Sequence, residues 1–194
     1  MKLRLGVLGS GKGSNFQAIM ETIREGRLEA EMRMVISDVQ QAGVLNLARK
    51  FNVPSHYVPP GRFRTKLEPE IERKIVRILQ DAEVELVILA GFMRVLKEPM
   101  LNAFAGRIIN IHPSLLPKFR GLEAWTQALK ANEQVTGCTV HYVDAGVDTG
   151  KILAQKSVPI LPNDTPELLH ARIQNAEHVL LPSVIAEIAM KKNA

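Results

Sequence analysis

The residues Leu86-Val87-Ile88-Leu89-Ala90 form a continuous apolar run in the middle of a 194-residue chain. A strand needs such a run when both of its faces are covered, as at the centre of a parallel sheet. Elsewhere in the N-terminal half, apolar runs of strand length alternate with stretches of helical spacing. This alternation predicts an α/β fold with an open, mostly parallel, doubly wound sheet and right-handed crossovers.

The remaining elements follow from apolar spacing and turn residues. The expected strands are 3–8, 32–36, 55–58, 86–90, 107–111, 138–143 and 151–160, and the expected helices are 14–24, 42–51, 67–80, 123–131 and 166–190. The last two strands are joined by a turn-rich loop, 144–150, and antiparallel strands are expected in the C-terminal half. Because no repeat, low-complexity tract or linker interrupts the chain, one domain is expected over residues 1–194.

Composition narrows the classes of function. Lys and Arg total 25 against 20 Asp and Glu, and the resulting charge of +5 attracts phosphates and carboxylates. The cations are scattered and only two tyrosines and one tryptophan can stack on bases, which disfavours nucleic acid as a partner. No apolar run reaches the roughly 18 residues of a membrane helix, so no membrane partner is expected.

The single cysteine, Cys138, excludes an internal disulfide and favours a reducing compartment. A catalytic thiol is one interpretation, but a small buried strand residue is the favoured one. The chain starts directly with its first strand and shows no signal peptide, so a cytoplasmic location is expected.

A glycine-rich segment, Gly9–Asn15, joins the first strand to the first helix, where open α/β sheets bind anions. A Walker A loop would need Ser or Thr at Gly13, and a dinucleotide fingerprint would need glycine at Ser14. The favoured ligand is therefore a simple phosphomonoester, with a dinucleotide as second choice and a plain tight turn as the alternative without a ligand. The expected contacts come from the backbone amides of Gly11, Lys12, Gly13, Ser14 and Asn15, with added charge from Lys12.

Two polar side chains stand at the end of the strand that precedes Pro113. Asn110 and His112 are two residues apart and therefore share a face, at the carboxyl edge where open α/β sheets bind ligands. An amide and an imidazole at this place are suited to stabilise an oxyanion. Asp148, in the glycine-rich loop, is the expected partner of His112 and would raise the imidazole pKa toward neutrality; Asp144 is its rival.

At these residues a resemblance becomes specific. The segment Asn110–Pro117, preceded by Leu89–Leu96, is similar to the glycinamide ribonucleotide formyltransferases of folate-dependent purine (IMP) biosynthesis. The similarity runs from Ser10–Asn15 to Gln174–His178, which is nearly the whole chain. It implies a Rossmann-like fold of the formyltransferase type, a phosphate-binding half over about 1–100, and a folate and catalytic half over about 101–194.

The resemblance implies that Asn110, His112 and Asp148 are catalytic. The substrate amine would attack the formyl carbon of the co-substrate, 10-formyltetrahydrofolate, without an acyl-enzyme and without a metal. Asn110 and protonated His112 would stabilise the tetrahedral oxyanion, while Asp148 sustains the histidine's charge and assists proton transfer. The partners implied are small molecules alone, and a monomer and a homodimer both stay open.

The resemblance also assigns the two binding regions. Gln174 and Glu177, on one face of the last helix, would contact the phosphoribosyl part. The pterin slot would be lined by Phe92, Met93, Arg94, Val95 and Leu96, with Asp144 also assigned to folate. Without the resemblance, Phe92 and Met93 are interpreted as core residues, and Arg94 as a solvated charge.

The sequence departs from the family at Lys12, where members often have Asn, and at Leu122–Trp125, where a histidine-containing stretch is common. The nearest alternatives are a formyltetrahydrofolate hydrolase and another folate-dependent formyltransferase, such as that acting on methionyl-tRNA. A non-enzyme alternative is a phosphate- or nucleotide-binding regulator, which would need the glycine loop but not Asn110, His112 and Asp148 together.

Overall fold

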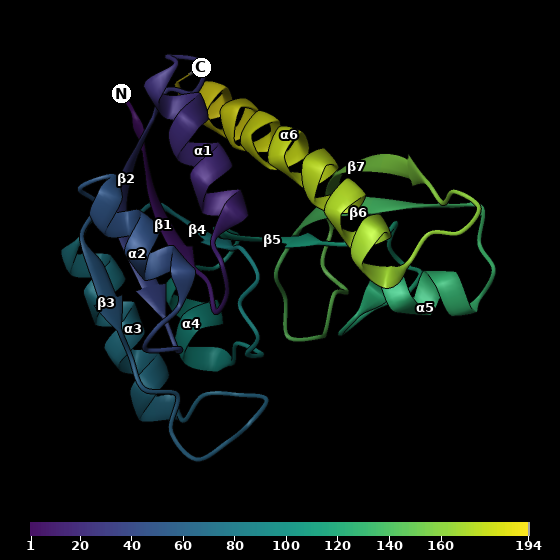
Figure 1. Ribbon diagram of the computed structural model, residues 1–194. Helices are drawn as coiled ribbons and strands as arrows, with labels where there is room; N and C mark the ends of the chain where they lie inside the picture. Colours follow the sequence, from purple (N-terminus) through teal and green to yellow (C-terminus); the bar gives the residue numbers. More distant parts are fainter. Residues whose placement is uncertain (194) are drawn as a thin grey trace.

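The computed structural model describes residues 1–193, the last of these by its backbone alone, and within them a single sheet organises the fold (Figure 1). Its strand order is β3-β2-β1-β4-β5-β6-β7. The strands of this part of the chain are β1 (Leu3–Leu8), β2 (Ala30–Ser37), β3 (Ser55–Tyr57), β4 (Leu86–Leu89), β5 (Ile108–His112), β6 (Val135–Tyr142) and β7 (Ile152–Pro159).

Helices pack on both faces of the sheet (Figure 1). They are α1 (Ser14–Arg24), α2 (Gly43–Lys50), α3 (Pro69–Asp81), α4 (Glu98–Ala103), α5 (Ala124–Lys130) and α6 (Pro166–Asn193). None of the helices in residues 1–193 combines the length and apolar character that crossing a bilayer requires.

The strand directions confirm the predicted fold class. Neighbouring strands from β3 to β5 pair in parallel, whereas β6 and β7 are antiparallel to their neighbours. The chain runs from β1 outward to β3, returns to pair β4 with β1, and then continues in the opposite direction. The order of strands therefore reverses between β1 and β4, the position at which open α/β sheets form a ligand crevice at their carboxyl ends.

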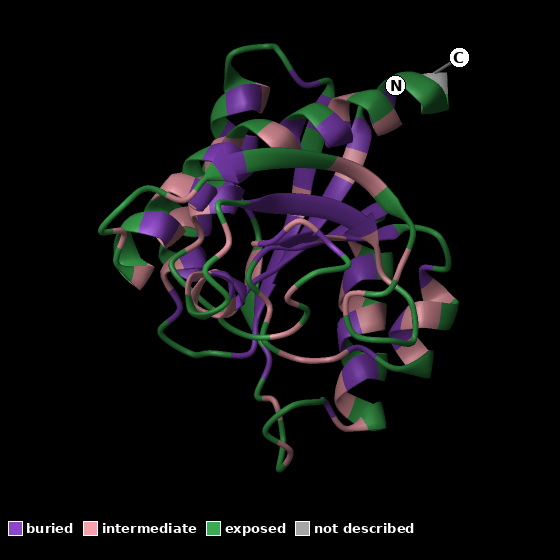
Figure 2. Cartoon of the chain, turned by 90° about the vertical axis from the view of Figure 1, so that its right-hand side faces the viewer, coloured by how far each residue is buried: buried purple, intermediate pink, exposed green. Residues whose placement is uncertain are grey.

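The central strand β4 shows why the sheet is covered on both faces. Leu86 and Ile88 pack into a core cluster with residues of α1, α2 and α6, whereas Val87 and Leu89 pack into a second cluster with residues of α3 and α4. Successive side chains of a strand point to opposite faces, so a continuous apolar run supplies both clusters. The buried strands lie inside the shell of helices in Figure 2.

The structure corrects several predicted boundaries and adds one helix. β6 begins at Val135, three residues before the predicted start, and the other ends differ by one or two residues in most cases. α4 was not predicted, because six residues give little helical periodicity. The buried carboxylate of Glu72 on α3 accepts hydrogen bonds from the N–H groups of Lys97 (2.9 Å) and Met100 (3.4 Å), so the start of α4 is stabilised from another element.

Candidate active site

The loops that follow β1 and β4 meet at the carboxyl edge of the sheet. The backbone N–H of Ser10 donates to the carbonyl of Gly91 (3.0 Å), and the N–H of Met93 donates to Oγ of Ser10 (3.0 Å). Since β1 and β4 are adjacent parallel strands, their following loops emerge side by side. The glycine loop and the segment 91–96 are thus joined into one surface.

The glycine loop is packed closely against the start of α2. Gly13 has φ 85°, and a Cβ built on it would lie 2.8 Å from Cα of Val44; the N–H of Val44 donates to the carbonyl of Gly11 (3.1 Å). The backbone N–H groups of Gly11–Asn15 donate to no acceptor among residues 1–193. Free amide donors at the start of a helix are the arrangement in which proteins bind anions, and the binding of phosphate to this cradle stays a prediction.

The structure brings together the three residues that the sequence placed in the catalytic centre. Nδ1 of His112 lies 3.3 Å from Oδ2 of Asp148, and Nδ2 of Asn110 donates to Oδ1 of the same carboxylate at 3.4 Å. His112 and Asp148 have side chains only 5% and 12% exposed. Asp144, the rival carboxylate, is exposed and accepts instead from the N–H of Gly146 (3.0 Å) and Oγ1 of Thr149 (2.6 Å), as a turn residue does.

The protonation of His112 differs from the sequence-based expectation. Burial lowers the pKa of His112 below its ordinary value, because a buried imidazolium loses its hydration. Asp148 and the carbonyl of Phe119, 2.8 Å from Nε2, act in the opposite sense, and nearby His141 adds to the lowering. Asp148 thus raises the pKa of His112 as expected, but burial outweighs this effect and the net direction is downward in the protein without ligands.

Asp148 is held as a carboxylate. Burial by itself would raise its pKa, but the hydrogen bond from His141, the proximity of His112 and the donation from the N–H of Gly121 (2.9 Å) outweigh burial and lower the pKa of Asp148. Asp148 has φ 51°, a left-handed conformation that non-glycine residues adopt at some cost and that is concentrated at functional sites.

The last helix supplies a buried polar pair beside the cradle. Nδ2 of Asn15 donates to Oε2 of Glu177 (2.8 Å), although the two residues are far apart in the chain. Burial raises the pKa of Glu177 to about 7, and the hydrogen bond from Asn15 acts in the opposite sense. Oδ1 of Asn15 is buried without a hydrogen-bond partner among residues 1–193. Gln174, one turn earlier on α6, is half-buried on the same side of the helix.

The segment predicted for the pterin slot is divided between core and surface. Leu96 is fully in the core and Phe92 packs partly against it, while the side chain of Met93 is 56% exposed. Arg94 is not a solvated charge: its Nε donates to Oδ2 of buried Asp38 (2.7 Å), and its Nη1 donates to the carbonyls of residues 63 and 64. Nε and Nη1 of its guanidinium are therefore engaged within the protein.

The sequence as a whole matches a known family. The family described as formyl transferase covers residues 3–185. The chain belongs to the formyl transferase family.

Individual members of the family resemble the chain along most of its length. Phosphoribosylglycinamide formyltransferase of Bacillus subtilis is 43% identical over 185 residues, covering 95% of this chain and 94% of the relative. The trifunctional purine biosynthetic protein adenosine-3 of Drosophila pseudoobscura pseudoobscura is 49% identical over 190 residues, but the chain spans only 14% of that relative. The crystal structure of glycinamide ribonucleotide transformylase 1 from Symbiobacterium toebii superimposes with a TM-score of 0.94 at 45% identity, covering 98% of this chain and 89% of that one.

One residue of this formyl transferase site was missed by sequence reasoning. His141, on β6 directly opposite Asn110, is buried, and its Nε2 lies 3.1 Å from Nδ2 of Asn110 and 3.5 Å from Oδ1 of Asp148. Its Nδ1 faces the carbonyl of Tyr142 (2.8 Å) and therefore carries a hydrogen, while its Nε2 faces both Asn110 and Asp148. The available signal was alternation, because Thr139 and His141 are polar residues two positions apart and therefore share one face of the strand.

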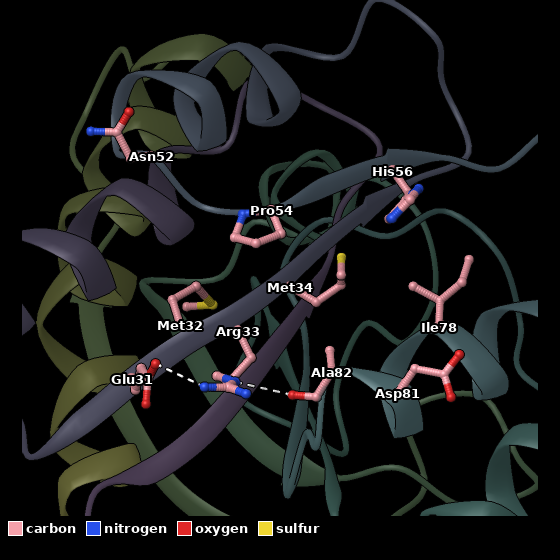
Figure 3. Close-up of a pocket in the computed structure, with 10 residues that line it drawn as sticks. All are labelled: Glu31, Met32, Arg33, Met34, Asn52, Pro54, His56, Ile78, Asp81 and Ala82. Carbon is pink, nitrogen blue, oxygen red and sulfur yellow. Dashed lines mark hydrogen bonds and ion pairs between the residues drawn. The ribbon is translucent and has the colours of Figure 1, made fainter.

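A separate groove of about 610 Å³ lies away from this site (Figure 3). It is lined by β2 residues near the strand start, such as Glu31 and Arg33, by His56 of β3 and by the end of α3. Parallel strands present their amino ends at the edge opposite to the ligand crevice, so the groove shares no residue with the family's site. Across residues 1–193, no group of three or more His, Cys, Asp or Glu side chains has the arrangement of a metal site.

Proposed function

We propose that this chain transfers the formyl group of 10-formyltetrahydrofolate to the amine of glycinamide ribonucleotide. The observation that carries the proposal is the convergence of Asn110, His112 and Asp148 at the same carboxyl edge of the sheet as a cradle of free backbone amides. The 43% identity to the Bacillus subtilis formyltransferase over nearly the full length of both proteins supports the same substrates.

The cradle and α6 bind the ribonucleotide in this proposal. The phosphate accepts from the amides of Gly11–Asn15, at the positive end of the α1 dipole, and Lys12 adds charge. Gln174 and Glu177 face the phosphoribosyl part. The unpaired Oδ1 of Asn15 is an acceptor for a sugar hydroxyl, since a buried acceptor without a donor is costly.

The folate lies along the segment 91–96 in this proposal, and Asp144 is kept as a folate contact. The N–H groups of Met93 and Val95 already donate to Ser10 and to the carbonyl of Thr65. The recognition of the pterin edge therefore falls on the remaining backbone groups of the segment. Met93 and Val95 supply apolar surface, whereas Leu96 contributes from within the core.

The chemistry is a direct acyl transfer. The amine nitrogen of the ribonucleotide bonds to the formyl carbon, and the formyl oxygen becomes an oxyanion. The bond from that carbon to N10 of the folate then breaks, and N10 receives a proton. Asn110 donates to the oxyanion, and its longer contact, 3.4 Å to Asp148, is the one that a ligand oxygen replaces.

Proton transfer follows from the lowered pKa of His112. A neutral imidazole takes the proton that the attacking amine loses, and the carboxylate of Asp148 stabilises the imidazolium that forms. The same proton then moves to N10. In the structure without ligands, Nε2 of His112 carries a hydrogen that it donates to the carbonyl of Phe119 (2.8 Å). To act as the base, the ring takes the tautomer with its hydrogen on Nδ1, facing Asp148, and Nε2 is freed when the turn 118–121 moves.

The remaining expectations stay predictions of this proposal. They are a single domain with phosphate-binding and folate-binding halves, small molecules as the only partners, no nucleic acid or membrane, a monomer or homodimer, and a cytoplasmic location. Residues of both halves contribute to the proposed ribonucleotide site, because Asn15 and Glu177, which are hydrogen-bonded, come from opposite ends of the chain.

A spectroscopic assay for tetrahydrofolate, run with and without glycinamide ribonucleotide, tests the proposal. We expect turnover only when the amine substrate is present. Turnover without it would identify a formyltetrahydrofolate hydrolase. Calorimetry separates the non-enzyme alternative, because a regulator would bind a nucleotide but not a folate analogue.

A further inference from the structure

Two aromatic rings from different helices stack beside the candidate ribonucleotide site. The indole of Trp125 on α5 and the imidazole of His170 on α6 are parallel, with centroids 3.8 Å apart and 5° between the ring planes. Both residues are half-buried, and Trp125 is the only tryptophan of the chain. The stack fixes the plane of the imidazole and leaves its nitrogens at the ring edge.

The position of His170 on α6 places it in line with the residues assigned to the ribonucleotide. His170, Gln174 and Glu177 are spaced four and three residues apart, which puts them on one face of the helix. Glu177 is bonded to Asn15 at the start of α1 (2.8 Å), so this face is turned toward the glycine loop. α6 extends from α5 to α1 (Figure 1). The stack on Trp125 places His170 in the part of α6 that packs on α5.

Lys12 is the neighbouring charge in the glycine loop. It is exposed, and it has no carboxylate within 4.0 Å among residues 1–193. Burial lowers the pKa of His170, and the positive charge of Lys12 lowers the pKa further, so the two groups are within electrostatic reach. In the same part of the chain, no hydrogen bond is made by the imidazole nitrogens of His170. Lys12 therefore offers an ammonium without a carboxylate partner, and His170 offers an imidazole edge without a hydrogen-bond partner on the α6 face that is turned toward the glycine loop through Glu177.

A phosphate dianion satisfies all of these groups at once. It accepts from the amides of Gly11–Asn15, neutralises Lys12 and accepts a hydrogen bond from His170. A neutral ligand would leave Lys12 without a counter-charge. Buried Asn15 adds an acceptor, because its Oδ1 has no hydrogen-bond partner among residues 1–193. This acceptor fits a ligand that also carries hydroxyl groups.

We infer that His170, oriented by its stack on Trp125, is a phosphate-binding residue that completes the cradle together with Lys12. The ligand class is a phosphomonoester, and the inference rests on the proposed function because that phosphate belongs to glycinamide ribonucleotide. His170 binds substrate in this scheme and takes no part in the chemical step. Trp125 is a positioning residue.

The test compares His170→Phe with His56→Phe. Phenylalanine keeps the stack on Trp125 but removes the ring nitrogens, and His56 is an exposed histidine of the far groove (Figure 3). We expect His170→Phe to weaken calorimetric binding of inorganic phosphate about tenfold and to raise KM for glycinamide ribonucleotide by a similar factor, with a much smaller change in kcat. His56→Phe should match the unmodified protein.

The fluorescence emission of Trp125 tests whether phosphate binds next to His170. Phosphate should change the tryptophan emission of the unmodified protein, because it alters the charge on the stacked imidazole, and should leave the emission of His170→Phe unchanged. Lys12→Gln, at an exposed position that does not threaten folding, should also weaken phosphate binding about fivefold to tenfold. Unchanged phosphate affinity in His170→Phe or in Lys12→Gln would overturn the inference.

The experiment separates this inference from the proposed function. If formyl transfer occurs and His170→Phe keeps the KM of the unmodified protein, the phosphate contact is wrong and the function stands. If no formyl transfer occurs but His170→Phe loses phosphate affinity, the function is wrong and the phosphate contact stands.

Discussion

Nδ1 of His112, at the end of β5, lies 3.3 Å from Oδ2 of Asp148, which comes from the loop between β6 and β7. Both side chains are largely buried, and the same carboxylate also accepts from the N–H of Gly121. Asp148 is therefore fixed in place from several sides. The imidazole of His112, the carboxylate of Asp148 and the amide of Asn110 therefore lie together at the carboxyl edge of the sheet.

Asp148→Asn tests the role of this carboxylate. The substitution keeps the size of the side chain but removes the charge that stabilises a protonated His112. We expect kcat to fall by about 10²- to 10⁴-fold, the range typical of lost acid–base catalysis. Binding of glycinamide ribonucleotide should change little. The matched control is Asp81→Asn, at an exposed carboxylate of the separate groove, and equal losses in the two variants would remove Asp148 from the mechanism.

The pH dependence of kcat/KM tests whether His112 begins the reaction neutral. Its pKa is lowered, so the imidazole is already unprotonated at neutral pH and becomes protonated only as the pH falls through that lowered pKa. We expect the rate to fall on the acid side through two ionisations, those of His112 and of the substrate amine. His112→Gln should be nearly inactive, and its residual rate should show the amine ionisation alone. A rate that falls with rising pH because of His112 would indicate a reactive imidazolium instead.

Two glycines of the loop form a matched pair for substitution. Gly13 has φ 85° and an added Cβ would contact Cα of Val44, whereas Gly11 has open space around it. Gly13→Ala should destabilise the protein by about 2 kcal/mol or more and displace the cradle. Gly11→Ala should change the stability by less than about 1 kcal/mol. Urea denaturation and phosphate titration measure both effects, and equal behaviour of the two variants would contradict the packing argument.

Glu177→Gln should change how stability depends on pH. The folded-state pKa of about 7 lies above the ordinary carboxyl pKa of 4.5, so the folded protein binds this proton more tightly than the unfolded chain. The resulting stabilisation is complete below the unfolded pKa and is lost as the pH rises through about 7. Glutamine keeps a polar group for Asn15 and does not titrate. Between pH 4.5 and 8 the unmodified protein should lose up to about 3 kcal/mol relative to the variant in urea unfolding. If the difference in unfolding free energy between the two proteins does not change with pH, the pKa of Glu177 lies near its ordinary value.

Arg94→Met should destabilise the fold more than it affects catalysis. It leaves buried Asp38 without its cationic partner, a change that typically costs about 3–5 kcal/mol. The double variant Arg94→Met with Asp38→Asn removes both charges and should recover much of that loss in thermal or urea unfolding. If the double variant is no more stable than Arg94→Met alone, the loss of the ion pair is not the cause of the destabilisation.

The fold was predictable because its main signals are local. The run Leu86–Ala90 implied a strand covered on both faces, and the two core clusters receive alternate side chains of β4. The short helix α4 left no such signal, since its start is capped by Glu72 from another helix. A cap supplied by a residue distant in the chain has no signature in the sequence of the helix itself.

Those parts of the candidate site that lie at the ends of strands were predictable from the sequence. Asn110 and His112 lie at the end of β5, where their spacing and Pro113 placed them. The partnership of His141 with Asn110 depends on the antiparallel register of β5 and β6, which spacing along the chain does not specify. The ion pair of Arg94 with Asp38 likewise joins the ends of two different parallel strands.

The sequence by itself determined the alternation of strands and helices, the glycine cradle after β1 and the paired polar residues at the end of β5. These features depend on side-chain periodicity and on backbone requirements within a few residues. Only the tertiary structure decided that Asp148 rather than Asp144 meets His112, that His141 joins them, and that burial lowers the pKa of His112. Each of these depends on contact and solvent exclusion between segments far apart in the chain, which local sequence patterns do not determine.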